Sequence, residues 1–249
     1  MRVLLVDNSN GRTKWMLYAG TLRAETLRRE ATAELTSELL RDAAAALEAE
    51  AVLISSVVPS CRPLFDDAFA DLPHVFLSAR QTLPVDFSSY PGASTLGADR
   101  IANVLGLLSL RHESAIAVDA GTAITYDVLM QRDGRPVFGG GVISPGFAAL
   151  RDYLPARTAQ LPQVAAELPV HAVGQSTAEA MQGGIMFGFR GMVREILAEL
   201  AAALGQHPVV IATGGDAELL HQLLPQEVNA ADALLTFRGL SLAADTLFG

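Results

Sequence analysis

The chain has 249 residues, half of them hydrophobic, and it carries a formal net charge of −9. A field of this sign repels nucleic acid and anionic lipid, so neither is expected as a main partner, and a small anion has to be bound by local groups. The single cysteine, Cys61, excludes an intrachain disulfide, and no apolar run has the length of a membrane span. We therefore expect a cytoplasmic protein that binds small molecules.

The first half opens with a short buried strand that ends in a carboxylate. Val3 to Val6 is the strand, Asp7 ends it, and the turn formers of DNSNGR lead into a hairpin partner at Thr13 to Tyr18. Periodicity and composition predict the later elements of this half as helix 32–50, strand 52–58, helix 60–70, loop 83–96 and helix 99–110.

The opening pattern returns at residue 115. IAVDAGTAITYDVL, like LLVDNSNGRTKWML, has a strand, an Asp, a tight turn and a second strand, with Asp119 in the place of Asp7. We interpret this as an internal repeat, with chance similarity as the alternative, and it predicts two related lobes, 1–113 and 114–249. The later elements are predicted as a Gly-rich strand and turn at 138–146, helix 147–153, helix 178–204, strand 209–212, helix 216–224 and helix 239–247. Alternating strands and helices place the chain in the α/β class.

Three turns follow buried strands, at Asp7 to Thr13, Asp119 to Thr122 and Thr213 to Asp216. Ligands of α/β sheets gather beyond the carboxyl ends of strands, where backbone N–H groups approach phosphate and a carboxylate can hold Mg²⁺. None of the turns matches the GxxxxGK[ST] or GxGxxG patterns. The repeated arrangement nevertheless indicates nucleotide binding between two lobes.

Asp99 lies in LGADR, where an irregular loop meets a helix. It is either a helix cap or a general base, because phosphoryl transfer to an alcohol needs a carboxylate that accepts the hydroxyl proton. Arg100 beside it could clamp an anionic substrate or form a surface salt bridge.

A set of segments carries a resemblance to a known family: DNSNGRTK, YPGASTLGADR, VDAGTAITYDV, GGGVISPG, RTAQLP, STAEAMQGG and ATGGD. Together they resemble the type III pantothenate kinases, the Bvg accessory factor family, in order from Val3 to about Asp216. The resemblance implies the acetate and sugar kinase, Hsc70 and actin superfamily. It therefore implies two related lobes of the actin-like, ribonuclease H-like ATPase fold, with mixed sheets flanked by helices. The implied activity is ATP-dependent phosphorylation of pantothenate to 4'-phosphopantothenate, the first step of coenzyme A biosynthesis.

The resemblance also implies roles for individual residues. Asp99 would accept the proton of the primary hydroxyl of pantothenate. The pocket for pantothenate would be lined by Tyr90, Gly97, Ala98, Asp99, Arg100 and Thr177. The ATP-binding residues would be Asp7, Asn8, Ser9, Asn10, Gly11, Arg12, Thr13, Lys14, Thr122, Gly214 and Gly215. Asp7 would lie near the Mg²⁺ that accompanies ATP, and Asp119 would bind a monovalent cation, K⁺ or NH₄⁺.

The family works as a homodimer, so the Gly-bearing helix 178–204 would either contribute to an interface or pack on its own sheet. The first turn departs from the usual Asp-x-Gly-Asn-Thr pattern, with Ser9 in place of Gly and Gly11 in place of Thr. Gly92 and Ala93 replace a usual acidic-Pro pair after Tyr90. The altered first turn motivates one alternative to pantothenate phosphorylation: a catalytically weak or non-catalytic ligand-binding or regulatory protein on the same scaffold. A kinase for another small alcohol or sugar acid is a further alternative.

Overall fold

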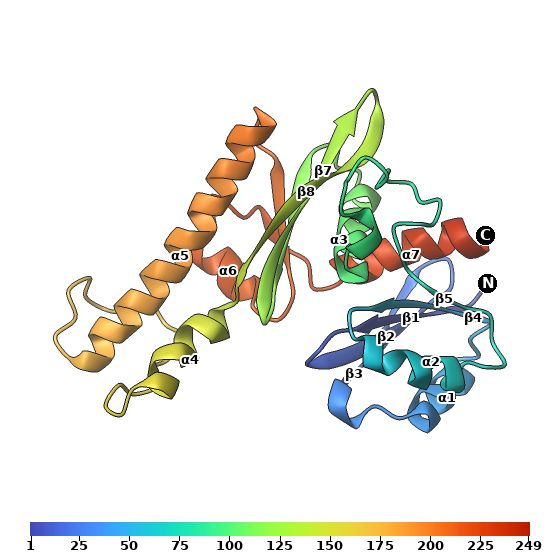
Figure 1. The fold of residues 1–249 in the computed structure, drawn as a ribbon, viewed down its shortest axis with the longest axis horizontal. Helices are drawn as coiled ribbons and strands as arrows, with labels where there is room; N and C mark the ends of the chain where they lie inside the picture. Colours follow the sequence, from blue (N-terminus) through green and yellow to red (C-terminus); the bar gives the residue numbers. More distant parts are fainter. The chain divides into compact units, whose positions relative to one another are not determined.

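Two five-stranded sheets organise the chain (Figure 1), with strand orders β3-β2-β1-β4-β5 and β10-β9-β6-β7-β8. The computed structural model describes residues 1–249. The strands are β1 Val3–Asn8, β2 Arg12–Tyr18, β3 Leu22–Ala31, β4 Ala51–Ser56, β5 His74–Phe76, β6 Ala115–Ala120, β7 Ala123–Arg132, β8 Arg135–Pro145, β9 Val209–Thr213 and β10 Ala230–Ala231. The α-helices are α1 Ser37–Ala46, α2 Arg62–Ala68, α3 Ala98–Ser109, α4 Phe147–Arg157, α5 Thr177–Leu204, α6 Ala217–Leu223 and α7 Leu235–Phe248. Short 3₁₀ turns are η1 Thr32–Glu34, η2 Pro59–Cys61 and η3 Ala93–Thr95.

The two sheets repeat one plan. In each, the first strand of the set lies in the middle, with the second and third strands on one side and the fourth and fifth on the other. β1 pairs in parallel with β4, and β6 pairs in parallel with β9. In these pairs Asp7 lies opposite Ser55, and Asp119 lies opposite Thr213. This repeat confirms the predicted α/β fold of two related lobes with mixed sheets.

The chain divides into two compact units. The first contains residues 1–113, 129–140 and 234–249, and the second contains 114–128 and 141–233. The first unit therefore includes the ends of β7 and β8 that flank their connecting turn, together with the C-terminal helix α7. The division into lobes 1–113 and 114–249 stays a prediction, and it shares the break after Glu113 with these units.

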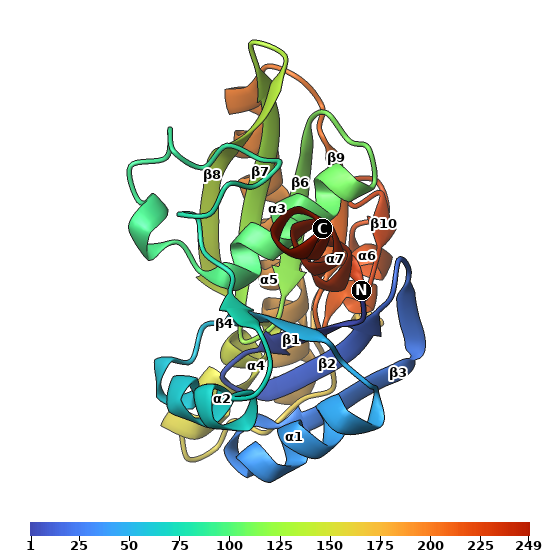
Figure 2. The same cartoon turned by 90° about the vertical axis from the view of Figure 1, so that its right-hand side faces the viewer.

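In the first unit, helices lie on both faces of the sheet (Figure 2). α1 and α2 cover the face that carries Leu4, Val6 and Ile54, and these residues form one buried cluster with Phe65 of α2 and Phe69, which directly follows it. α3 and α7 cover the opposite face, where α7 packs on β1 and β4. The turn after β1 is therefore supported from both sides by buried structure.

The crossing of α3 and α7 is unusually close. A Cβ atom added at Gly239 of α7 would overlap the carbonyl oxygen of Ala102, and one added at Gly106 of α3 would overlap that of Leu235. The hydroxyl of Thr236 donates to Oδ1 of Asn103 over 2.8 Å at the same buried contact. The C-terminal helix thus fixes the position of the helix that begins at Ala98.

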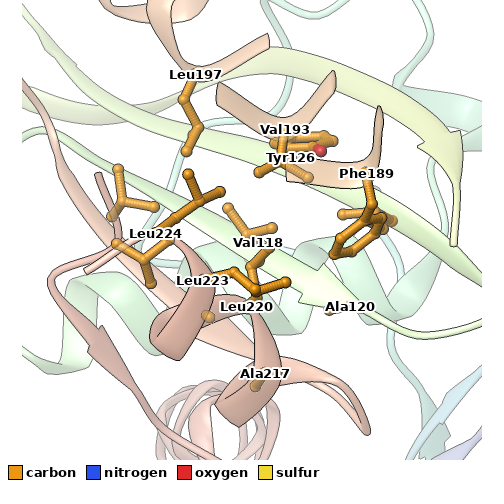
Figure 3. Packing of buried hydrophobic residues seen from close by; sticks show 14 of the residues in the cluster. Val118, Ala120, Tyr126, Phe189, Val193, Leu197, Ala217, Leu220, Leu223 and Leu224 are labelled. Carbon is orange, nitrogen blue, oxygen red and sulfur yellow. The ribbon is translucent and has the colours of Figure 1, made fainter. Parts of the chain in front are cut away.

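The second unit has one large apolar core, part of which is shown in Figure 3. Val118 and Ala120 of β6 and Tyr126 of β7 contact Phe189, Val193 and Leu197 of α5 and Leu220 of α6. α5 therefore packs against its own sheet, which is one of the two alternatives that the sequence left open for this helix. Its glycines at 184, 188 and 191 lie on an exposed face with open space around them.

Three strands differ from the expectations of the sequence. No strand was predicted at the positions of β3, β5 and β10. The predicted helix 32–50 is shorter in the structure, where α1 begins at Ser37 and ends at Ala46. β3 is an edge strand whose side chains are mostly charged and exposed, so the apolar alternation that marks a half-buried strand is absent. β5 and β10 are too short for any periodicity to appear. None of the helices combines the length and apolar character needed to cross a membrane.

Candidate active site

The first turn joins β1 to β2 and presents three exposed residues at its tip. Asn10, Gly11 and Arg12 are exposed, while Asp7 is only 7% exposed at the end of its strand. Lys14 Nζ lies 3.4 Å from Oδ2 of Asp7, because the two residues are paired across β1 and β2. The tip can meet an anion through its backbone and Arg12, with a carboxylate and an ammonium group just behind it.

Two residues of this turn bury their polar groups inside the protein. The side-chain amide of Asn8 donates to Thr13 Oγ1 over 2.8 Å, and its Oδ1 accepts from Ser56 Oγ over 2.6 Å. Asn8 is 1% exposed and Thr13 is fully buried. Their side chains hold β1, β2 and β4 together at the base of the turn.

The departures of the first turn from the family pattern cause no backbone strain. Neither Ser9 nor Gly11 has a positive φ, so neither position requires glycine. Ser9 also contributes a bond, since its Oγ donates to the Arg12 carbonyl oxygen over 2.9 Å. A Cβ atom at Gly11 would meet no atom within 4 Å.

Asp99 lies in the first turn of α3, next to the end of β4. Gly97 is the N-cap of this helix and makes no side-chain cap bond, while Oδ1 of Asp99 accepts from the Arg100 backbone N–H over 2.8 Å. A Cβ atom at Gly97 would lie 2.5 Å from Oδ1 of Asp99 and 3.5 Å from Val57. The N–H of Val57 in turn donates to the carbonyl oxygen of Asn8. Asp99 and the first turn therefore lie at the same edge of the first sheet, and glycine at 97 leaves room for the carboxylate.

An aromatic cluster stands beside Arg100. The guanidinium carbon of Arg100 lies 5.6 Å from the ring centroid of Phe138, and Phe138 meets Tyr90 edge-to-face at 5.0 Å. Backbone bonds between Asp86 and β8 attach the loop that carries Tyr90 to the strand that carries Phe138. Sequence reasoning missed Phe138, and its position directly before the Gly-rich strand motif was the available signal.

Three turns meet in the second unit. Gly214 has φ of 91°, and a Cβ atom there would lie 2.5 Å from both the Ala120 carbonyl oxygen and Oδ1 of Asp119. A Cβ atom at Gly146 would overlap the backbone of Gly121, and the N–H of Gly146 donates to the Thr122 carbonyl oxygen over 3.1 Å. The segments DAGT, ISPG and TGGD thus form one site in which only glycine allows the close approach.

The charge around this second site is mixed. Burial raises the pKa of Asp216, and the nearby Arg151 of α4 acts in the opposite direction. The guanidinium of Arg151 also binds Asp152 over 2.7 Å, and this hydrogen bond lowers the pKa of Asp152. Arg151 therefore holds positive charge next to the TGGD turn.

The predicted site residues gather in two groups. The first unit brings Asp7 to Lys14 to the same sheet edge as Gly97 and Asp99, with Arg100 and Tyr90 around Phe138. The second unit brings Asp119 and Thr122 together with Gly214 and Gly215. Thr177 is exposed at the first position of α5. No group of three or more His, Cys, Asp or Glu side chains could hold a metal ion, so protein carboxylates would have to share any Mg²⁺ with a substrate.

Comparison with solved structures gives the class of this fold. The chain matches a Baf family transcriptional activator from Campylobacter jejuni with a TM-score of 0.64 and 18% identity over 98% of each chain. It matches a ROK family glucokinase from Streptomyces griseus, solved with glucose and AMPPNP, with a TM-score of 0.55 and 20% identity over 99% of each. The fold is that of the sugar kinase and actin-like ATPases.

Sequence comparison then gives the family. The type III pantothenate kinase family model matches residues 3–199. A type III pantothenate kinase of Akkermansia muciniphila is 38% identical over 98% of both chains. One of Methylacidiphilum infernorum is 34% identical over 98% of this chain and 89% of that protein. The chain belongs to the type III pantothenate kinase family.

Proposed function

We propose that the chain transfers the γ-phosphoryl group of ATP to the primary hydroxyl of pantothenate, with Asp99 as the general base. Family membership supports the reaction, and the observation that carries the assignment is the place of Asp99. Its carboxylate lies at the same sheet edge as the first turn, beside Arg100 and the aromatic cluster. Nothing in this geometry favours a non-catalytic protein on the same scaffold.

In this mechanism the Asp99 carboxylate accepts the hydroxyl proton as the substrate oxygen attacks the γ-phosphorus. Arg100 binds the carboxylate of pantothenate, and Phe138 keeps the guanidinium plane in place through a cation–π contact. Tyr90 closes the same side of the pocket against Phe138. Groups held in place in this way orient the alcohol before transfer.

The first turn is proposed to bind the phosphates through its exposed tip. Asn10, Gly11 and Arg12 supply backbone and side-chain donors, and Lys14 adds a charge beside Asp7. Asp7 suits the Mg²⁺ that travels with ATP, because Mg²⁺ is commonly held by one or two carboxylates and substrate phosphates. Since Asn8 and Thr13 bond to each other inside the protein, we assign them to the support of the turn.

The site in the second unit is proposed to contact ATP and to bind a monovalent cation. Oδ1 of Asp119 and the carbonyl oxygen of Ala120 converge over Gly214. Oxygen donors of this kind suit K⁺ or NH₄⁺, so the residues present fit such an ion. Thr122 is exposed beside this point, and Gly215, next to the packed Gly214, leaves open backbone for the nucleoside.

We further propose a homodimer. The exposed glycine face of α5 supports it, because small residues let two helices approach closely, and the exposed Thr177 begins the same helix. A cytoplasmic location stays a prediction.

The direct test is an ADP-release assay with ATP, Mg²⁺ and pantothenate. We expect ADP production that depends on pantothenate and that is higher in potassium than in sodium buffer. A panel of other small carboxylate-bearing alcohols serves as the control for substrate class. ADP release with one of those alcohols and none with pantothenate would refute the substrate, whereas equal rates in both buffers would refute the cation site at Asp119 alone.

Restoring the family residue in the first turn is expected to strengthen ATP binding. Gly11→Thr adds a hydroxyl at the exposed tip, where φ is compatible with any residue and no atom obstructs the Cβ. One added hydrogen bond to a charged phosphate lowers the KM for ATP by about tenfold. Gly11→Val is the matched control, since it has the same shape without the hydroxyl. An unchanged KM for ATP in Gly11→Thr would show that the hydroxyl contacts no phosphate.

A further inference from the structure

Thr32, which directly follows the edge strand β3, contacts the first turn through both its backbone and its side chain. Its N–H donates to the carbonyl oxygen of Gly11 over 3.2 Å, and its Oγ1 donates to the carbonyl oxygen of Ser9 over 2.7 Å. Its Oγ1 also lies 3.0 Å from Oγ1 of Thr13. One residue outside the turn thus binds two of the carbonyl groups inside it.

These two bonds decide which way the peptide groups of the turn face. A carbonyl oxygen is the negative end of its peptide dipole, and it repels a phosphate that it faces. Thr32 holds the oxygens of Ser9 and Gly11 on its own side, and the N–H and Oγ of Ser9 both donate to the oxygen of Arg12. The carbonyl groups of Ser9, Gly11 and Arg12 are therefore bound within the protein before any anion arrives.

A continuous line of polar side chains connects Thr32 to the middle of the sheet. From Thr32 it runs through Thr13 and Asn8 to Ser56 on β4, with consecutive distances of 3.0, 2.8 and 2.6 Å. The bond between Asn8 and Thr13 is buried, so water does not compete for it. The turn is thereby tied to three neighbouring strands, and through β4 to the edge where Asp99 lies.

We infer that Thr32 is a positioning residue for phosphate binding, which holds the first turn in the orientation that receives ATP. This inference rests on the proposed function, because it assigns the first turn to the phosphates. It deepens that function by naming a residue about 20 positions beyond the turn (roughly one strand hairpin away) that holds two of the turn's carbonyl groups. Thr32 touches neither substrate in this scheme and acts only through the turn.

The test is Thr32→Val, which keeps the shape and the backbone N–H but removes the hydroxyl. We expect the Kd for Mg²⁺-ATP to rise about tenfold, because the bond from the Thr32 hydroxyl to the Ser9 carbonyl oxygen is lost and that peptide group is no longer held in place. The KM for pantothenate should stay within about twofold of the wild-type value, since Arg100 and Tyr90 do not contact Thr32. Thr32→Ser, which retains the hydroxyl, should restore ATP binding.

Thr26→Val, on the strand β3 that Thr32 follows, is the matched control. Thr26 is half-buried like Thr32, and its Oγ1 also makes two bonds, accepting from Leu17 N–H and donating to the Arg23 carbonyl oxygen. It should lower the melting temperature as much as Thr32→Val without changing the Kd for ATP. Equal ATP binding in Thr32→Val and wild type, or equal losses in both valine variants, would overturn the inference. Thr32→Ala repeats the comparison if the valine variant folds poorly.

A second measurement separates this inference from the proposed function. Amide hydrogen exchange at residues 9–11, measured without nucleotide, should be faster in Thr32→Val than in Thr26→Val. If the wild-type chain bound no ATP, the proposed function would fail, and the exchange rates would still show whether Thr32 orders the turn. Unchanged exchange at these residues would refute the positioning role whatever the chain binds.

Discussion

Asp99→Asn is expected to lower kcat about a thousandfold, because a general base in the transition state contributes about 10²- to 10⁴-fold to the rate. Asparagine keeps Oδ1, so it can still accept the hydrogen bond from the Arg100 N–H that orders the start of α3. It has nearly the same shape as aspartate, and the room that Gly97 leaves for the side chain remains sufficient. The variant therefore removes proton acceptance and leaves the local structure in place.

The measurement is kcat in the ADP-release assay together with the Kd for ATP from calorimetry. ATP binding should stay within about twofold of the wild-type value, since the phosphates are assigned to the turn after β1 and not to α3. Asp42→Asn, on the exposed face of α1, is the control for a general loss of one negative charge. Turnover of Asp99→Asn close to that of the wild-type enzyme would exclude Asp99 as the base.

The sequence predicts the parts of this fold that short-range chemistry determines. Buried apolar strands such as Val3 to Val6, the Asp that ends each first strand, and the glycine turns all leave local patterns, and the repeated plan follows from them. β3 leaves no such pattern, because an exposed edge strand is stabilised by its backbone pairing with β2 rather than by apolar side chains. Because β3 was not predicted, its end beside the first turn was not predicted either, and Thr32 could not be linked to that turn.

The candidate site divides along a similar line. The turn residues and Asp99 lie in recognisable motifs, so the family resemblance alone predicts them as site residues. Phe138 reaches Arg100 and Tyr90 only because residues 86 and 137 form an isolated bridge between a loop and a strand. Asn8 and Thr13 lie inside the predicted motif, yet their burial distinguishes support of the turn from contact with ATP. Both distinctions depend on tertiary contacts that no spacing rule contains.

The packing of the C-terminal helix α7 also depends on tertiary contacts that the sequence does not reveal, and a substitution in α7 is expected to have a large effect on stability. Gly239→Ala should destabilise the protein by about 3 kcal/mol, near the upper end for added volume in a packed core. The added methyl group would overlap the carbonyl oxygen of Ala102, and backbone on both sides leaves no flexible side chain to move aside. The melting temperature should fall by roughly 6–12 °C for a chain of this size.

Gly191→Ala of α5, measured on the monomer at high dilution because this face is also the proposed dimer interface, is the matched control, since nothing lies within 4 Å of the new Cβ in the single chain. Removing a helical glycine there should raise stability by about 0.5–1 kcal/mol. Thermal unfolding of both variants therefore gives shifts of opposite sign if close helix approach is the cause. α3 carries Asp99 at its start, so Gly239→Ala should also lower kcat at temperatures where the protein stays folded. A melting temperature equal to that of the wild-type protein would mean that α7 does not pack closely on α3 in solution. The position of Asp99 would then not depend on α7.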